Sequence, residues 1–215
     1  MPAYFLCRDN LKTPHFADLI RGHMPPSLIR SVRETDLEEV RSIYAKEVLE
    51  GIASFEIEPP HIEEMRARLH RVRDANLPYL VSEVDGRIAG FAYAVPYRPR
   101  PAYRYTVENS VYVARWAQRQ GIGSQLLDAL VSACARAGAR QMVAIIGGIK
   151  HTASIRAHEN AGFRKVGTLE NVGWKLGRWL DTVVMQRALN PNADSPPEPV
   201  SYTHLRAHET EAALV

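Results

Sequence analysis

The segment Gln118-Arg119-Gln120-Gly121-Ile122-Gly123 decides the fold of this chain, because of the segments on either side of it. An apolar, β-rich run, Val111-Tyr112-Val113, precedes it, and residues 124–131 follow with leucine, alanine and valine at helical spacing. A strand that leads through a glycine turn into a helix leaves the first helical amides unpaired at the positive end of the helix dipole. Such a turn favours binding of a phosphate or pyrophosphate, although a purely structural turn can carry the same glycines.

Two other nucleotide-binding motifs are excluded at this turn. The dinucleotide-binding fingerprint needs a further glycine three residues after Gly123, and Leu126 stands there. A Walker A loop ends in Gly-Lys-Ser or Gly-Lys-Thr, and neither tripeptide occurs in the chain.

The remaining pattern, Gln/Arg-x-x-Gly-x-Gly/Ala, resembles that of the GCN5-related N-acetyltransferases (GNAT). Residues 97–113 and 173–181, with Ala53-Ser54-Phe55-Glu56, are similar to the phosphinothricin and methionine sulfoximine acetyltransferase branch of that superfamily. The resemblance runs from about Ile29 to Leu189. It implies transfer of an acetyl group from acetyl-CoA to the amino group of a small amino acid analogue, such as phosphinothricin or methionine sulfoximine or sulfone. Direct attack in a ternary complex, no metal and a homodimer are further implications.

Composition fits one soluble domain with a substantial core: 215 residues, 46% apolar and 24% charged. A formal net charge of +3 is too small to indicate a nucleic-acid partner. The apolar run from Met142 to Ile149 is shorter than the roughly 18–20 residues of a membrane helix, so no membrane partner is expected. Cys7 and Cys134 form no disulfide framework, and charges interrupt the first residues, so we expect a cytoplasmic protein.

The organisation along the chain predicts three parts. Residues 1–26 are an N-terminal extension in which Met24 is an alternative start, and residues 27–189 are the GNAT domain. Residues 190–215 are a polar tail that we expect to be disordered. Within the tail, residues 201–209 back-translate to a sequence that resembles a transposase sequencing adapter. We therefore interpret 199–210 as adapter read-through; a natural disordered tail is the alternative.

Hydrophobic periodicity predicts an α/β fold with a mixed central sheet of about six or seven strands and helices on both faces. A capping box at Thr35 and Glu38 should start the first helix. A second helix should follow Pro59-Pro60, and an Asp85-Gly86 turn should close a β-hairpin. The further expected elements are strands at 28–32, 107–113, 142–146, 165–169 and 182–186, and helices that run to Gly138 and over 154–161.

The resemblance also implies a set of cofactor-binding residues. Amides of the glycine turn would hold the pyrophosphate, and the arm of the cofactor would lie beside the strand before the turn and the helix at 154–161. The residues are Val111, Val113, Gln118, Arg119, Gln120, Gly121, Ile122, Gly123, Ser124 and Ser154. His151 departs from the asparagine that is frequent at its position in the family.

Glu108 and His158 are the predicted catalytic residues. A carboxylate in an apolar strand has a raised pKa and suits a general base, although from the residues alone strand alternation favours a solvent-facing Glu108. The resemblance favours the base. His158 occupies the position of a family tyrosine that serves the leaving thiolate, and an imidazole could also accept the proton of the amine. The oxyanion donors would be backbone amides near Val113, where the fourth and fifth strands part.

Arg98 and Arg100 are the predicted clamp for a carboxylate or phosphinate, because a guanidinium binds such groups in a bidentate manner. A solvated basic loop is the competing interpretation. Phe55 would be an apolar wall of the substrate site, Glu108 would also contact the substrate, and Trp174 and Trp179 are expected in the core or at an interface.

Two alternatives to this function remain at this point. The first is acetylation of another amine, such as a peptide N-terminus or a polyamine, although a polyamine site should be acidic and the loop around Arg98 is basic. The second is a non-catalytic acyl-CoA-binding module that keeps the glycine turn.

Overall fold

The structure is a computed structural model that describes residues 27–148 and 152–190. The predictions for 1–26 and 191–215, and the departure at His151, lie outside the described residues. The strands are β1 (Leu28–Ser31), β2 (Tyr79–Val84), β3 (Arg87–Pro96), β4 (Thr106–Val113), β5 (Gln141–Gly147), β6 (Arg164–Lys175) and β7 (Arg178–Ala188). The helices are α1 (Leu37–Glu50), α2 (Ile62–Asp74), α3 (Ile122–Arg136) and α4 (Thr152–Asn160), with short 3-10 turns η1 (Glu34–Asp36), η2 (Pro101–Tyr103) and η3 (Arg115–Ala117).

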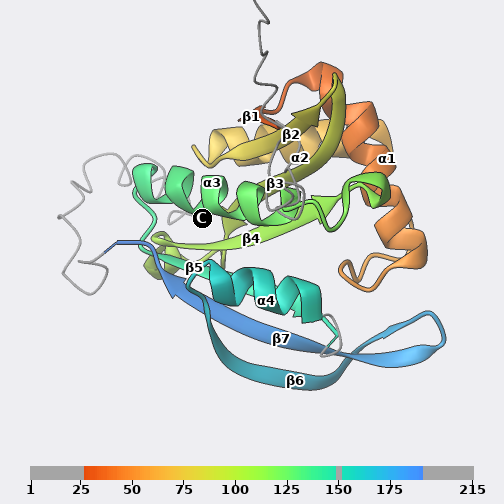
Figure 1. Cartoon of the computed structure of the whole chain (residues 1–215). Coiled ribbons are helices and arrows are strands. Elements are labelled where there is room, and N and C mark those ends of the chain that lie inside the picture. The colour runs from red at the N-terminus through yellow and green to blue at the C-terminus, as the bar shows by residue number, and fades with distance from the viewer. Residues whose placement is uncertain (1–26, 149–151, 191–215) are drawn as a thin grey trace, which may run out of the picture.

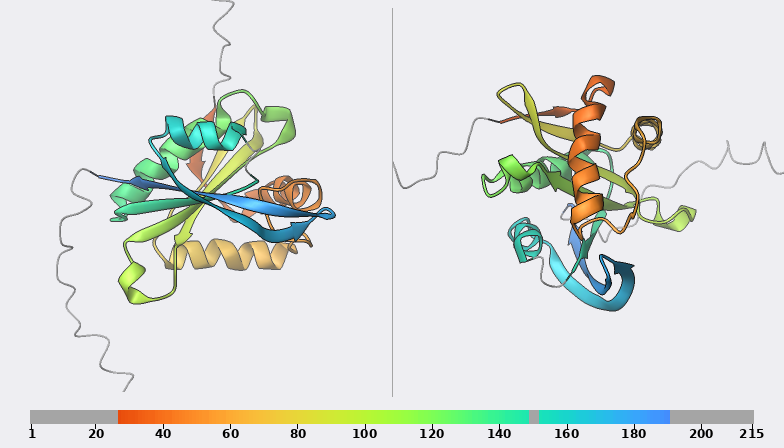
Figure 2. Two further views of the ribbon diagram at one scale, coloured as in Figure 1. Left: turned by 90° about the horizontal axis from the view of Figure 1, so that it is seen from below. Right: turned by 90° about the vertical axis from the view of Figure 1, so that its right-hand side faces the viewer.

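The strands form one seven-stranded sheet in the order β1-β2-β3-β4-β5-β7-β6. All neighbours are antiparallel except β4 and β5, which run parallel with α3 as the crossover helix. Helices α1 and α2 cover one face, and α3 and α4 cover the other (Figures 1 and 2). The prediction of a mixed sheet with helices on both faces is therefore confirmed.

Strand β3 divides the core between these two faces. Ala92 and Ala94 pack with α3, whereas Phe91 packs with α1 and α2. Successive side chains of a strand point to opposite faces, so this alternation places one apolar cluster on each side of the sheet. Strands β3 and β4 pack closely at Gly90, because a Cβ there would lie 2.7 Å from the carbonyl oxygen of Tyr112.

The predicted N-cap of the first helix is wrong by one residue, since Asp36 and not Thr35 precedes α1. Thr35 lies within η1, and α1 begins only at Leu37. Asp36 takes over the local capping role, since its Oδ2 accepts the backbone N–H of Arg33 at 2.7 Å and pairs with Arg30 at 2.6 Å. The Arg30 guanidinium, through that hydrogen bond, holds the pKa of Asp36 below its usual value. The ion pair between Arg30 of β1 and Asp36 of η1 therefore outweighs the local Thr-x-x-Glu pattern.

The C-terminal hairpin is longer than its sequence pattern predicts. Strands β6 and β7 extend to a tight turn at Leu176 and Gly177, which have φ angles of 52° and 71°. Trp174 and Trp179 face each other across this end of the hairpin, and they are 57% and 59% exposed. The expectation that they lie in the core of the chain is therefore wrong.

Candidate functional site

The glycine turn forms an uncapped helix N-terminus. Gly121 is the N-cap of α3 with φ 79°, Arg119 also has a positive φ of 61°, and no side chain caps the helix. The first helical hydrogen bond joins the N–H of Gln125 to the carbonyl of Gly121 at 3.0 Å. The backbone N–H groups of Ile122, Gly123 and Ser124 therefore have no partner within the helix. The first turn of α3 also contains no acidic residue that would repel an anion. Such a concave row of N–H groups fits an anionic phosphate.

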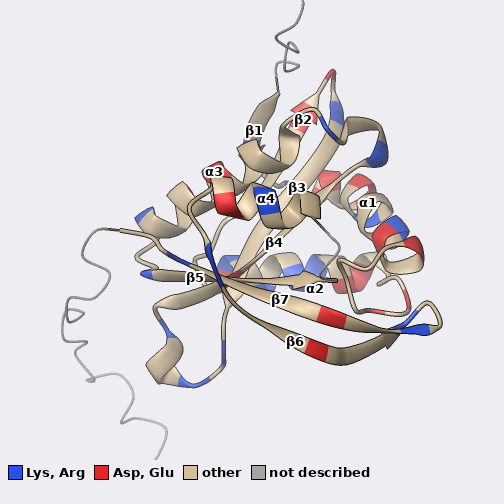
Figure 3. Cartoon of the chain, turned by 60° about the horizontal axis from the view of Figure 1, so that its bottom comes forward, with Lys and Arg blue, Asp and Glu red and all other residues tan. Residues whose placement is uncertain are grey.

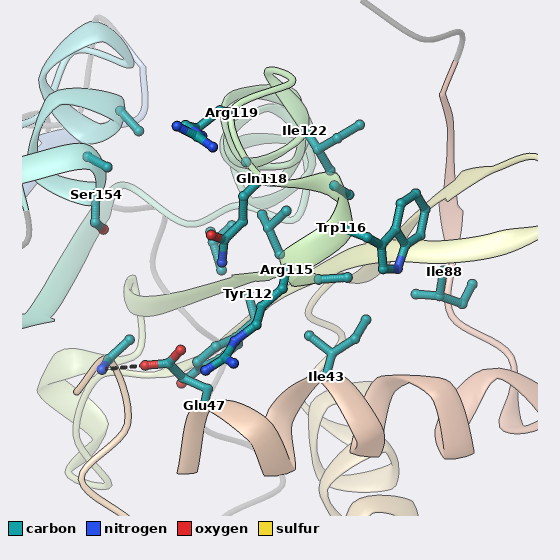
Figure 4. A pocket seen from close by; sticks show the side chains of 18 of the residues that line it. Ile43, Glu47, Ile88, Tyr112, Arg115, Trp116, Gln118, Arg119, Ile122 and Ser154 are labelled. Atoms are coloured by element: carbon teal, nitrogen blue, oxygen red, sulfur yellow. Dashed lines mark hydrogen bonds between the residues drawn. The ribbon is translucent and has the colours of Figure 1, made fainter. Parts of the chain in front are cut away.

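This turn forms one wall of a cavity of about 730 Å³ between α1, α3 and α4 (Figure 4). The predicted cofactor residues that line it are Val111, Val113, Gln118, Arg119, Gly121, Ile122, Gly123, Ser124 and Ser154. Gln120 does not line it, because its side chain turns away and donates to the carbonyl of Trp116 at 2.9 Å. The wall from α1, including Ile43 and Glu47, was not predicted, since a polar helix face has no local signal for a ligand.

Strands β4 and β5 part beside this cavity. Pairing between the two strands ends at Asn109 and Ala144, although β4 continues to Val113 and β5 to Gly147. The strands thus part at Ser110, earlier along β4 than the predicted position near Val113. Backbone groups on the facing edges of parting strands lose their ladder partners and become available to a ligand.

A second cavity of about 430 Å³ lies at this gap. It is lined by the predicted catalytic and substrate residues Glu108, His158 and Phe55, and by the predicted cofactor residues Val111 and Ser154. Both cavities share Ala53, Val111, Tyr112, Ser154 and His158, so they meet along the gap. The arrangement gives two connected chambers, one beside an anion-binding helix terminus and one beside a carboxylate.

Glu108 is half-buried in the smaller chamber rather than turned to bulk solvent. Burial raises its pKa above the usual value, and the positive charge of Arg98 opposes this shift. Tyr112, four residues further along β4, packs edge-on against Tyr44 of α1 with ring centroids 5.1 Å apart. Strand alternation therefore turns Glu108 toward the face of α1 and α2.

His158 approaches the gap from the other face, on α4. It is 5% exposed, and its ring packs edge-on against Phe163 at 5.0 Å. Its Nε2 lies 3.0 Å from Nδ2 of Asn109, and its Nδ1 lies 2.8 Å from the carbonyl oxygen of Ser154. Burial lowers the pKa of His158. Asn109 was not predicted, because its role depends on a partner 49 residues away.

Arg98 and Arg100 do not line either chamber. Both are exposed on the loop between β3 and β4, which also carries Arg104 and projects from the sheet as a ribbon with blue segments at its arginines (Figure 3). The Arg98 guanidinium lies over the ring of Tyr97 at 4.6 Å. The positive charge of Arg98 acts on Glu108, so the structure brings these two groups near each other, whereas Arg100 is exposed on the same loop.

The loop between α1 and α2 is fixed by side chains from several elements. Ser54 shares a hydrogen bond of 2.9 Å with the hydroxyl of Tyr44, and its carbonyl accepts Nζ of the buried Lys175 at 2.5 Å. Glu47 accepts the N–H of Ala53 at 2.8 Å. Phe55 packs so closely on Gly173 that a Cβ there would lie 2.2 Å from its ring. These contacts preorganise one wall of the smaller chamber.

Among residues 27–148 and 152–190, no group of three or more His, Cys, Asp or Glu side chains is arranged to hold a metal ion. None of the helices within these ranges is long and apolar enough to cross a membrane.

Two connected chambers, a helix terminus suited to an anion and a half-buried carboxylate fit an enzyme that uses a phosphate-bearing co-substrate. Comparison with known proteins agrees: the Acetyltransferase (GNAT) domain family matches residues 29–184. The chain belongs to this family and is an acetyltransferase.

Individual relatives are similar over most of their length. The chain is 50% identical over 170 residues to a phosphinothricin N-acetyltransferase of Alcaligenes faecalis, covering 79% of this chain and 86% of that protein. It is 35% identical over 165 residues to an L-methionine sulfoximine/L-methionine sulfone acetyltransferase of Salmonella typhimurium, covering 77% and 96%. A crystal structure of a phosphinothricin acetyltransferase from Sinorhizobium meliloti in complex with AcCoA superimposes with a TM-score of 0.77, at 41% identity and 81% and 95% coverage.

Proposed function

We propose that this enzyme transfers the acetyl group of acetyl-CoA to the α-amino group of a small amino acid analogue of the phosphinothricin or methionine sulfoximine type. The observation that carries the proposal is the junction of the two chambers at the gap between β4 and β5, with the α3 terminus on one side and Glu108 on the other. Relatives that act on phosphinothricin and methionine sulfoximine support the substrate class.

The residues of the larger chamber fit acetyl-CoA. Its pyrophosphate would face the unpaired amides of Ile122, Gly123 and Ser124, with the Arg119 side chain beside them. The gap at Ser110 and Val111 would receive the thioester end, and the parted edge of β4 supplies backbone donors for an oxyanion. When bound, acetyl-CoA supplies an activated acyl group, so the chain itself needs to orient the amine and remove its proton.

Glu108 removes that proton in our proposal. An α-ammonium group is unreactive until it loses a proton, and a carboxylate with a raised pKa is a better base than an exposed one. Because Glu108 faces the α1 and α2 side, the amine would enter from that side and meet the acyl group at the gap. The direct attack requires both substrates to be bound together.

Arg98 and Glu108 together suit the zwitterion of an α-amino acid. The carboxylate of such a substrate would pair with Arg98 while its ammonium group faces Glu108, and Arg100 on the same loop would add a second guanidinium. Phe55 provides an apolar wall for the side chain of the substrate. A polyamine lacks the anionic group that this arrangement requires.

We also infer a homodimer in the cytoplasm. The edge strand β6 and its hairpin partner β7 expose large apolar side chains: Val166, Leu169, Val172, Trp174, Leu176 and Trp179. An exposed apolar patch on an edge strand is typical of an association surface. Sedimentation of the enzyme and of a Trp174→Lys variant tests this inference, since a dimer should become a monomer in the variant.

A thiol-release assay with acetyl-CoA tests the proposed function. The amines to be compared are phosphinothricin, methionine sulfoximine, methionine sulfone, spermidine and a short peptide. We expect the highest kcat/KM with the amino acid analogues. Preference for spermidine or the peptide would assign another amine as substrate, and acetyl-CoA binding without release of thiol would indicate a non-catalytic acyl-CoA-binding module.

A further inference from the structure

Asn109 and His158 form a buried polar pair whose proton positions are fixed by its partners. The carbonyl oxygen of Ser154 can only accept a hydrogen bond, so Nδ1 of His158, 2.8 Å away, must carry a proton. Burial lowers the pKa of the imidazole, which therefore carries no second proton at neutral pH. Nε2 is left as a lone pair, and it accepts the Nδ2–H of Asn109 at 3.0 Å.

The opposite orientation of the Asn109 amide is disfavoured. It would place Oδ1 against Nε2, and two acceptors would then face each other unless the buried imidazole took up a second proton. In the observed orientation, Oδ1 is buried and has no hydrogen-bond partner among the described residues. The Asn109 residue is 6% exposed and lines the smaller chamber, so the pair lies at the point where β4 and β5 part.

We propose that the carbonyl of Ser154 holds the proton of His158 on Nδ1, and that Asn109 is a positioning residue whose amide occupies the lone pair of Nε2, so that His158 exchanges no proton during acetyl transfer. The part that concerns acetyl transfer rests on the proposed function, whereas the locked tautomer does not. Both ring nitrogens of His158 are engaged in hydrogen bonds, and neither is available to protonate a leaving thiolate. Glu108 is then the group of the site that gains and loses the proton.

Charged groups on other elements leave this assignment intact. Glu108 on β4 and Glu56 in the loop after α1 line the same chamber, and Arg187 on β7 donates to the carbonyl of Ala161 at the end of α4. The pKa of His158 is governed by burial, and its hydrogen bond to the Ser154 carbonyl opposes that effect.

The direct test is a long-range ¹H–¹⁵N correlation spectrum of the full-length enzyme labelled with ¹⁵N-histidine, without substrates. Contacts with the Phe163 ring and comparison with His158→Gln identify the signals. We expect a protonated Nδ1 and an unprotonated Nε2, which stay so as the pH falls through about 6.5, the ordinary pKa of histidine. A protonated Nε2 at neutral pH would overturn the proposal.

Two variants of similar volume separate the roles of the amide. Asn109→Asp replaces the donor by an acceptor, so Nε2 should gain a proton and the pKa of His158 should rise above its ordinary value. Asn109→Leu removes the donor but leaves the Ser154 carbonyl, so the imidazole should stay neutral with its proton on Nδ1. An unprotonated Nε2 in folded Asn109→Asp at mildly acidic pH would show that the side chain at position 109 does not control the protonation of Nε2, and would overturn the role proposed for Asn109.

The pH dependence of kcat tests the consequence for acetyl transfer. We expect one acidic limb, which Asn109→Leu retains with a kcat lowered roughly three- to tenfold by the loss of one buried hydrogen bond. In Glu108→Gln this limb should be replaced by a rise at alkaline pH only, where the amine loses its proton without a base. A limb that persists in Glu108→Gln and vanishes in His158→Gln would overturn the inference, whereas no turnover with any amine would count against the proposed function and leave the spectra unaffected.

Discussion

Glu108 and His158 line one chamber from opposite faces of the sheet. They meet there because pairing between β4 and β5 ends at Asn109 and Ala144, which opens the sheet to both sides. The carboxylate faces the side of α1 and α2, and the imidazole is held by α4. In the proposed mechanism, the amine would therefore bind beside Glu108 and the acyl donor beside the α3 terminus.

The amides of the glycine turn should govern the affinity for acetyl-CoA. Gly123→Val places a branched side chain beside the unpaired N–H groups, where the Cβ itself would meet only Val113 Cγ2, at 3.4 Å. Loss of charge-assisted hydrogen bonds should raise the KM for acetyl-CoA by about one to two decades and leave the KM for the amine nearly unchanged. Steady-state kinetics with each substrate varied measures both. The control is Gly167→Val, since a Cβ there meets nothing within 4 Å. If Gly123→Val raised the KM values for acetyl-CoA and for the amine equally, the turn would have only a structural role.

Arg98 should recognise the carboxylate of the substrate. Arg98→Ala should lower kcat/KM for an amino acid analogue by about one to two decades, because one charge-assisted contact is lost. A decarboxylated analogue of the same amine should be little affected. Arg104→Ala, in the same loop, is the matched control. If Arg98→Ala lowers kcat/KM equally for the analogues with and without the carboxylate, Arg98 does not bind the carboxylate.

Lys175 should stabilise the loop that carries Phe55. Lys175→Met removes the donor to the Ser54 carbonyl, and a buried carbonyl without its partner costs about 1–3 kcal/mol. We expect a lower free energy of unfolding in urea and a raised KM for the amine, with little change in the KM for acetyl-CoA. The control is Arg178→Met, which removes an exposed cation at the tip of the same hairpin and should change neither quantity. A wild-type KM for the amine in Lys175→Met would show that the loop does not contribute to substrate binding.

The stability of the enzyme should report the burial of Glu108. Its pKa is higher in the folded chain than in the unfolded chain, so its contribution to stability is complete below the unfolded pKa and is lost as the pH rises through the folded pKa. Glu108→Gln should therefore be more stable than wild type in neutral buffer, and the difference should diminish in acid. Urea unfolding at several pH values measures this. A variant that is less stable at neutral pH would show that attraction to Arg98 outweighs the burial of the carboxylate.

Local sequence patterns predicted those parts of the molecule that depend on neighbours along the chain. The Asp85-Gly86 turn has two positive φ angles and closes the expected hairpin, and the glycine turn begins α3 where expected. The start of α1 was wrong because the ion pair of Arg30 with Asp36 is formed between elements.

The candidate site also contains residues that the sequence predicts and residues that it does not predict. Glu108 and the residues of the glycine turn follow from the strand–turn–helix pattern and the family resemblance. Asn109 and Lys175 have no such signal, because their functions depend on His158 and Ser54, which are distant in sequence. The exposed positions of Arg98 and Arg100 likewise depend on how the loop after β3 leaves the sheet.

The most direct test of the account is the single-turnover rate of Glu108→Gln across the pH range, with acetyl-CoA bound in advance. Single turnover excludes product release as the limiting step. We predict a rate lowered by roughly 10²–10⁴, the range for loss of general acid–base catalysis, with unchanged affinity for acetyl-CoA. Alkaline pH should restore part of the rate, because more of the amine is then neutral without help. Wild-type rates in Glu108→Gln at every pH would contradict the assignment of Glu108 as the base.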